Sequence, residues 1–228
     1  MHSWVLTAIS TALAESDCEA IDSGWLAQPV NAITSLAFSV VGVAIVVWSR
    51  RATGAERRFR TVLGVLLVAT GIGSFLYHGP QPIGSQLAHD VTFLAALALI
   101  AAADLRAGLR LSEWTQWVGT AAFAIIAAVV TSVTPEATNV FTGLATVGVI
   151  ASHFVVRRNG PIDSRALTFA VSMLAIALLF FLVGRTDGPL CDSGSVLQGH
   201  GAWHVFSALA IGAYAVATAP ARTSENPL

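Results

Sequence analysis

The stretch from residue 59 to residue 78 reads FRTVLGVLLVATGIGSFLYH, an apolar run in which Arg60 is the only residue with a permanent charge. About 20 apolar residues in a helix cross the hydrocarbon core of a bilayer, so this run is long enough to span a membrane. Six further stretches have the same character, and short loops rich in Gly, Pro, Asp or Arg separate them. The seven predicted spans cover residues 31–48, 59–77, 85–105, 114–133, 139–156, 165–184 and 199–218.

The overall composition agrees with a membrane protein. Of the 228 residues, 55% are hydrophobic and 11% are charged, and the mean hydropathy is +0.71. A net charge of -1 gives no reason to expect nucleic-acid binding. We therefore predict an all-α, polytopic membrane protein. Its seven transmembrane helices form one bundle over residues 31–218, with an outer segment at 1–30 and a cytoplasmic tail at 219–228.

The arginines predict the orientation of this bundle, because basic residues in short loops stay on the cytoplasmic side of a membrane. The chain has twelve arginines and no lysine, and eleven of the twelve fall on one side of the predicted spans. Only Arg185 falls on the other side. The N-terminus is therefore predicted to lie outside and the C-terminus in the cytoplasm. The eleven are Arg50, Arg51, Arg57, Arg58, Arg60, Arg106, Arg110, Arg157, Arg158, Arg165 and Arg222.

The outer segment contains two features of interest. Residues 1–14 are mildly apolar and lack the basic start of a secretory signal, which favours an interfacial helix over a cleaved signal peptide. The two cysteines of the chain, Cys18 and Cys191, both fall on the outer side. An oxidising outer compartment would allow a disulfide between them, and two free buried thiols are the alternative.

Ionisable side chains inside a bilayer are costly, and those in the predicted spans are therefore candidate functional residues. Ser74 and His78 are four residues apart and share a helix face, as do His200 and His204. Asp90 lies near the start of the third span. The predicted topology brings all five residues to the outer ends of the second, third and seventh spans, at a similar depth.

Three imidazoles suit Zn²⁺, which in catalytic sites keeps three protein ligands and one open position for water. His78, His200 and His204 are the predicted ligands. Asp90 is placed to accept and return a proton, and Ser74 to donate a hydrogen bond to a developing oxyanion. Each assignment has an alternative: the histidines could be interfacial or bonded within the bundle, and Asp90 could orient a ligand imidazole.

The remaining ionisable residues of the spans receive a structural interpretation. His89 is expected on a different helix face from Asp90, and His153 lies near the cytoplasmic end of the fifth span. Below the outer layer we find essentially only Asp104 and His153. A polar pocket that ends blindly favours catalysis over conduction, which argues against a metal or proton transporter.

Together these elements resemble the alkaline ceramidase family, within the seven-helix hydrolase superfamily that also contains the adiponectin and progestin receptors. The elements that match are Cys18 and Glu19, Asn31, the Gly-x-x-Ser-x-x-x-His run from Gly71 to His78, Asp90, and His200-x-x-Trp-His204. The resemblance implies zinc on the three histidines, catalytic roles for Ser74 and Asp90, and a Cys18–Cys191 disulfide. The implied reaction is hydrolysis of the amide of ceramide to a sphingoid base and a fatty acid.

The resemblance also implies a calcium site, to which Glu19 would contribute. The eukaryotic members have a Trp-Cys-Glu-x-Asn run and a later Glu. In this chain Asp17 replaces the Trp and Ile21 the Asn, and Gln28 lies near the place of the later Glu. A solvated acidic patch around Glu19 is the alternative to a bound calcium ion.

These observations lead to one functional expectation and one alternative. We expect an intramembrane zinc amidase that cleaves ceramide or a related N-acyl lipid and needs no obligatory protein partner. The arginine-only, alanine-rich composition indicates a bacterium of high GC content, hence an inner membrane with the site toward the periplasm. The alternative is a lipid receptor or sensor of the adiponectin-receptor kind, in which the metal is structural.

Overall fold

The computed structural model describes residues 17–156 and 162–219. Several sequence-based expectations fall outside these ranges. They are the interfacial helix at residues 1–14, most of the tail, and Arg157, Arg158 and Arg222.

The described residues form seven α-helices and no strand, and each helix coincides with a predicted span. A 3-10 turn, η1 (Pro135–Ala137), precedes α6 (Thr138–Ala151), and a π-helical turn, η2 (Ser152–Val156), follows it. The α-helices are α2 (Pro29–Ser49), α3 (Gly54–His78), α4 (Ser85–Leu109), α5 (Glu113–Val133), α6 (Thr138–Ala151), α7 (Ser164–Val183) and α8 (Gly199–Ala217).

Five of these helices, α2, α3, α4, α5 and α7, are long and apolar enough to cross a membrane. The regular part of α6 is only 14 residues long before η2 begins. Near its start α8 carries two histidines, which lower its hydropathy. The all-α, multi-pass class is therefore confirmed, while the count of seven spans and the orientation of the termini stay predictions.

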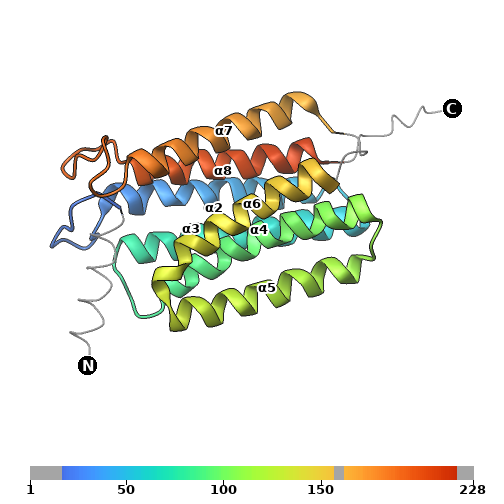
Figure 1. Cartoon of the computed structure of the whole chain (residues 1–228), viewed down its shortest axis with the longest axis horizontal. Helices are drawn as coiled ribbons and strands as arrows, with labels where there is room; N and C mark the ends of the chain where they lie inside the picture. Colours follow the sequence, from blue (N-terminus) through green and yellow to red (C-terminus); the bar gives the residue numbers. More distant parts are fainter. Residues whose placement is uncertain (1–16, 157–161, 220–228) are drawn as a thin grey trace.

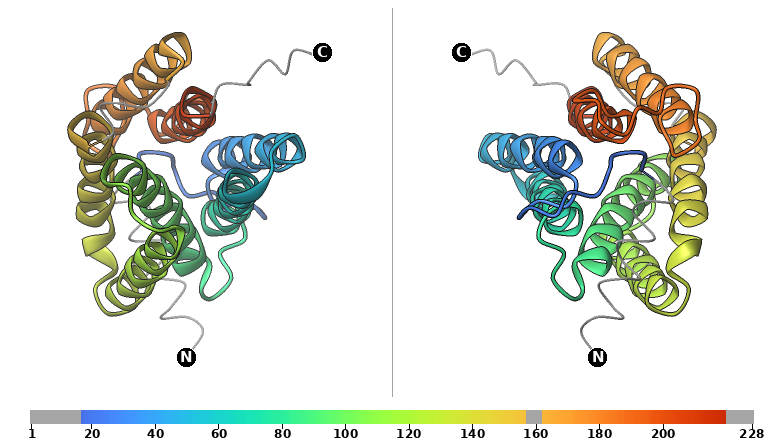
Figure 2. Two further views of the ribbon diagram at one scale, coloured as in Figure 1. Left: turned by 90° about the vertical axis from the view of Figure 1, so that its right-hand side faces the viewer. Right: turned by 90° about the vertical axis from the view of Figure 1, so that its left-hand side faces the viewer.

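Consecutive helices run in opposite directions along one bundle (Figure 1). The start of α2, the end of α3 and the start of α8 meet at one end of the bundle, and the α2–α3 and α4–α5 loops lie at the other. In the end-on views of Figure 2 the helices surround an interior instead of stacking in layers. The topology therefore brings residues 78 and 200 to the same end.

Glycines permit a close approach between α2 and α3. A Cβ added to Gly42 would lie 2.5 Å from the carbonyl oxygen of Gly64, and one added to Gly64 would lie 2.7 Å from the oxygen of Gly42. Helices in membranes associate largely through such close packing of small residues, because lipid tails are as apolar as the side chains. A glycine also permits close packing of α3 against α4 near the predicted site, where a Cβ on Gly73 would lie 2.8 Å from the backbone nitrogen of His89.

A disulfide between Cys18 and Cys191 joins the segment before α2 to the loop between α7 and α8, as predicted. Two hydrogen bonds reinforce this link: the Cys18 backbone N–H donates to Thr186 Oγ1 at 3.1 Å, and the Ala20 N–H donates to the Ser193 carbonyl at 3.0 Å. Residues 17–20 are thereby held over the start of α8.

Replacing Gly42 with Ala should destabilise the bundle by about 1 to 3 kcal/mol, because the new methyl group meets backbone and neither helix can yield locally. Gly143→Ala in α6 is the matched control, since a Cβ there meets no atom within 4 Å. That control should be neutral or gain up to about 1 kcal/mol from the higher helix propensity of Ala. Equal unfolding free energies for both variants in detergent would contradict the close α2–α3 packing.

Candidate metal centre

Three histidines from the ends of two helices converge on one point, at the end of the bundle where α3 ends and α8 begins. His78 is the last residue of α3, and His200 and His204 lie one turn apart on α8. Their ligand nitrogens all lie within 4.8 Å of one another. His78 and His204 have no exposed surface, and the His200 side chain is 13% exposed. The structure thus brings together the three residues that the sequence predicted as ligands.

The donor atoms fit a metal ion. Nε2 of His78 and Nε2 of His200 are buried, and among the described residues neither has a hydrogen-bond partner. A buried polar atom without a partner costs about 1 to 3 kcal/mol, and the cost is removed if the nitrogen binds a metal. Three neutral imidazoles are a common ligand set for Zn²⁺. The residues present therefore fit the predicted metal.

The opposite nitrogen of His78 is held by an amide. Its Nδ1 lies 2.8 Å from Gln28 Oε1, while Gln28 Nε2 donates to the Glu19 carbonyl at 3.0 Å. The second bond assigns the amide orientation, so Oε1 accepts and Nδ1 of His78 carries the proton. Nε2 is left with its lone pair for a metal.

His204 is oriented in a similar way by a hydroxyl group. Its Nδ1 lies 3.4 Å from Thr34 Oγ1, and this hydroxyl donates its own proton to the Val30 carbonyl at 2.7 Å. The Thr34 oxygen is therefore left to accept a bond from Nδ1–H. The tautomer of His204 again presents Nε2 to the centre.

Asp17 provides the carboxylate of the centre. Its Oδ1 lies 3.4 Å from Nδ1 of His200, and its Oδ2 lies 3.8 Å from Nδ1 of His78. Asp17 is itself buried and precedes the disulfide-bonded Cys18. A carboxylate behind a ligand imidazole fixes the ring and raises its basicity, which strengthens metal binding.

Sequence reasoning missed this orienting layer. Asp17 and Gln28 stood out only as departures from the calcium pattern, and Thr34 did not stand out at all. No local signal could reveal their role, because Thr34 and His204 are 170 residues apart in the chain.

Glu19, the predicted calcium ligand, caps the start of α2 with its side chain. Its two carboxylate oxygens accept the backbone N–H groups of Val30 at 2.7 Å and Asn31 at 2.8 Å. Burial raises the pKa of Glu19, and these two backbone hydrogen bonds oppose that rise. The carboxylate thus satisfies helix N–H groups that α2 cannot pair itself. The calcium site stays a prediction, and the carboxylate has a structural role without it.

Ser74, the predicted oxyanion donor, lies beside the three histidines. Its side chain has no exposed surface, and its Oγ lies 3.5 Å from Nε2 of His204. Ser74 is one turn before His78 on α3, so both side chains face the same point. The hydroxyl is therefore placed beside the nitrogens that would hold a metal.

Asp90 reaches the centre through its neighbour. Its Oδ1 lies 2.7 Å from Nδ1 of His89, and its Oδ2 accepts a hydrogen bond from Thr138 Oγ1 at 3.1 Å. The His89 ring stacks on Tyr77 at 5.5 Å and meets the His78 ring edge-on at 6.0 Å. His89 was expected on a different helix face from Asp90, yet the two side chains are in contact, and the His89 ring also meets that of His78.

Comparison with known proteins is consistent with this geometry. The model of a family described as Ceramidase matches residues 18–227, which is nearly the whole chain. The match contains all three histidines, Ser74 and Asp90. Among curated proteins, no sequence matches this chain.

Asp17→Asn should weaken zinc binding by about 10- to 100-fold, the loss typical when a carboxylate behind a ligand imidazole is removed. Competition with a chromophoric chelator measures the dissociation constant, with His204→Ala as the reference lacking a ligand. Asp22→Asn is the matched control, because Asp22 is exposed and, within the described part of the chain, its carboxylate accepts only the Gly24 N–H. A zinc affinity of Asp17→Asn equal to that of the control would exclude Asp17 from the centre.

Proposed function

The chain belongs to the ceramidase family, and we propose that it is a zinc-dependent amidase that cleaves ceramide or a closely related N-acyl lipid within the membrane. One observation carries this proposal: three buried imidazoles whose Nδ1 atoms face orienting groups and whose Nε2 atoms converge. Preorganised ligands on rigid helices suit a reactive metal, which must keep its geometry while a substrate comes and goes.

Hydrolysis of the amide joins a water oxygen to the carbonyl carbon, breaks the C–N bond and transfers a proton to the amine nitrogen. The products are a fatty acid and a free amine lipid. A zinc ion acts as a Lewis acid and makes hydroxide available near neutral pH. The chain itself must position the lipid, manage one proton and stabilise the negative charge on the carbonyl oxygen.

We assign proton transfer to Asp90, and stabilisation of the negative charge on the carbonyl oxygen to Ser74. The Asp90 carboxylate is bonded to His89, whose ring contacts that of His78, so it adjoins the centre without filling a ligand position. Ser74 Oγ faces the same point from α3 and has a proton to donate. A hydroxyl placed in a dry site is a suitable donor to a developing oxyanion.

We further propose that the centre faces the outer side of a bacterial inner membrane. The α2–α3 and α4–α5 loops, with seven arginines among residues 50–60 and 106–110, lie at the end of the bundle opposite the centre. The positive-inside rule places that end in the cytoplasm. The disulfide supports the same orientation, because such bonds persist in oxidising compartments.

A lipid hydrolysis screen with and without a zinc chelator tests the proposal. Purified protein is incubated with ceramides and other N-acyl lipids, and the released fatty acid is quantified by mass spectrometry. We expect release from at least one N-acyl lipid, loss of activity after chelation and recovery when Zn²⁺ is added. Activity that is unaffected by removal of the bound metal would refute the metal-dependent mechanism.

Asp90→Asn should keep zinc and lower kcat by roughly 100-fold or more, since the amide keeps the shape but cannot accept a proton. Zinc content and turnover are measured on the same preparation. Asp187→Asn, in the exposed loop before α8, serves as the matched control and should retain full activity. Turnover of Asp90→Asn at the wild-type rate would remove Asp90 from proton transfer.

A further inference from the structure

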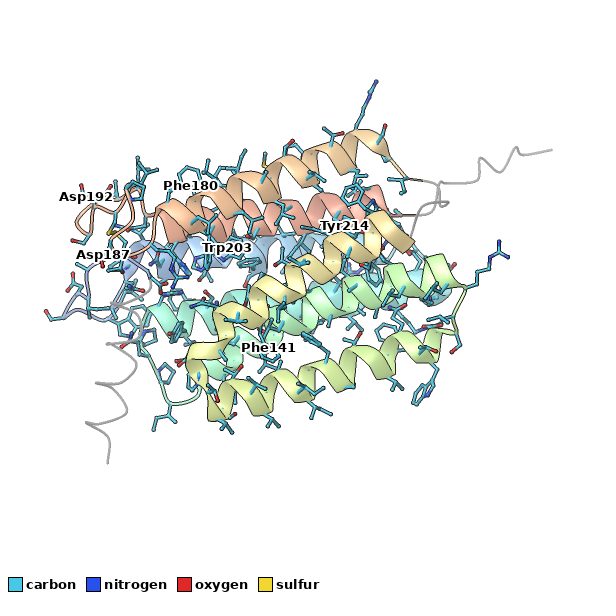
Figure 3. The ribbon with its side chains drawn as sticks, viewed as in Figure 1. Phe141, Phe180, Asp187, Asp192, Trp203 and Tyr214 are labelled. Atoms are coloured by element: carbon cyan, nitrogen blue, oxygen red, sulfur yellow. A yellow bond between two sulfur atoms is a disulfide. The ribbon has the colours of Figure 1, made fainter. Side chains whose placement is uncertain are left out.

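A second feature of the bundle has no role in the centre itself. An apolar pocket lies between α4, α6, α7 and α8. Its wall on α8 runs from Trp203, through Ser207, Ala210 and Ile211, to Tyr214. Figure 3 shows Trp203 and Tyr214 at separate levels along α8, with Trp203 nearer the end that carries the loop aspartates Asp187 and Asp192.

The outer end of this pocket adjoins the metal centre. Trp203 lines the pocket and directly precedes the ligand His204. Phe93, which also lines it, lies 6.1 Å from Trp203 and 5.6 Å from Phe38, measured between ring centroids. The Phe38 ring in turn lies 6.1 Å from His204. The end of the pocket near Trp203 is therefore separated from the centre only by contacting aromatic side chains, which places a chain attached to a carbonyl group at the centre beside the pocket.

The side of the pocket faces the outside of the bundle. Three of the lining residues are also partly exposed on the surface of the bundle. They are Ile150 at the end of α6 (37% exposed), Phe154 in η2 (55%) and Val171 in α7 (44%). In a membrane that exposed surface contacts lipid. An alkyl chain can thus move from the bilayer into the pocket between α6 and α7 without meeting water.

The inner end of the pocket is polar and internally bonded. Tyr214 donates its hydroxyl proton to the Asp104 carboxylate, and His153 Nδ1 lies 2.7 Å from the same hydroxyl. Ser152 Oγ also donates to Asp104, at 3.4 Å. These bonds tie α4, η2 and α8 together. Pushing a methyl group among them would break buried hydrogen bonds and leave their partners unsatisfied.

We propose that this pocket binds the acyl chain of the N-acyl lipid, and that the Asp104–Tyr214–His153 cluster limits the length of chain that it accepts. The inference rests on the proposed amidase function. Trp203 and Tyr214 are eleven residues apart on α8, which corresponds to about 16 Å at a rise of roughly 1.5 Å per residue. An extended alkyl chain advances about 1.25 Å per carbon, so the pocket holds roughly 12 to 14 carbons.

The first test measures kcat/KM for N-acyl sphingosines with saturated chains of increasing length. We expect the value to fall at least about tenfold between chains of roughly 12 and 18 carbons, because the longer chain must bend out between α6 and α7. Ala210→Leu fills the pocket one turn above Tyr214 and should shorten the preferred chain by about three carbons, the number that Leu adds to Ala.

The matched control is Ala213→Leu, which makes the same change on α8 at a partly exposed position outside the pocket lining. It should leave the length profile unchanged. Ala210→Val adds less volume and replaces Ala210→Leu if the larger side chain prevents folding. A length profile that is the same in wild type and in the folded Ala210 variant would overturn the proposal.

A second measurement separates this inference from the proposed function. Saturated free fatty acids of the same lengths are added to purified protein, and the shift in the midpoint of thermal unfolding is recorded. One outcome is that fatty acids stabilise the protein most at one chain length, that the Ala210 substitution shortens this length, and that no N-acyl lipid is hydrolysed. This outcome would refute the amidase and support the pocket. If hydrolysis occurs, and both hydrolysis and thermal stabilisation are independent of chain length and of the Ala210 substitution, the pocket proposal is refuted while the amidase proposal is supported.

Discussion

The convergence of three buried imidazoles is the constraint on which the rest of the structure depends. Each ring must present the same nitrogen inward, and inside a bilayer no bulk water can satisfy its other side. The chain therefore supplies one acceptor behind each ligand: the amide of Gln28, the hydroxyl of Thr34 and the carboxylate of Asp17. Because three tautomers must agree, the site is sensitive to groups that never touch a metal.

Those acceptors explain why the segment before α2 is fastened to the bundle. The disulfide-bonded Cys18 lies between Asp17, which faces His200 and His78, and Glu19, which caps the start of α2. The Glu19 carbonyl also holds the amide of Gln28. One short segment thus sets the start of a helix and the geometry behind two histidines. A covalent link to the loop before α8 keeps these contacts in register with the ligands on that helix.

The bundle separates its polar interior into two clusters joined by an apolar pocket. One cluster, at the start of α8, holds the histidines, Ser74 and Asp90, and the other, toward the end of α8, holds Asp104, Tyr214 and His153. The pocket between them is lined by aliphatic and aromatic side chains and faces the bilayer side of α6 and α7. This arrangement suits a substrate with one polar reacting group and a long apolar chain.

The sequence by itself determined the helices and singled out the three histidines and Ser74 as candidates for the site. Hydropathy over about 20 residues and spacings of four along a helix are local properties, which neighbouring residues settle. Only the tertiary structure decided that Thr34 orients His204, that His89 turns inward beside Asp90, and where the pocket ends. Those facts depend on the distances between helices and on the rotation of each helix about its axis. Glycines such as Gly73, and a disulfide between residues 173 positions apart, help to set both. The pattern of residues within one helix does not determine its distance from another helix.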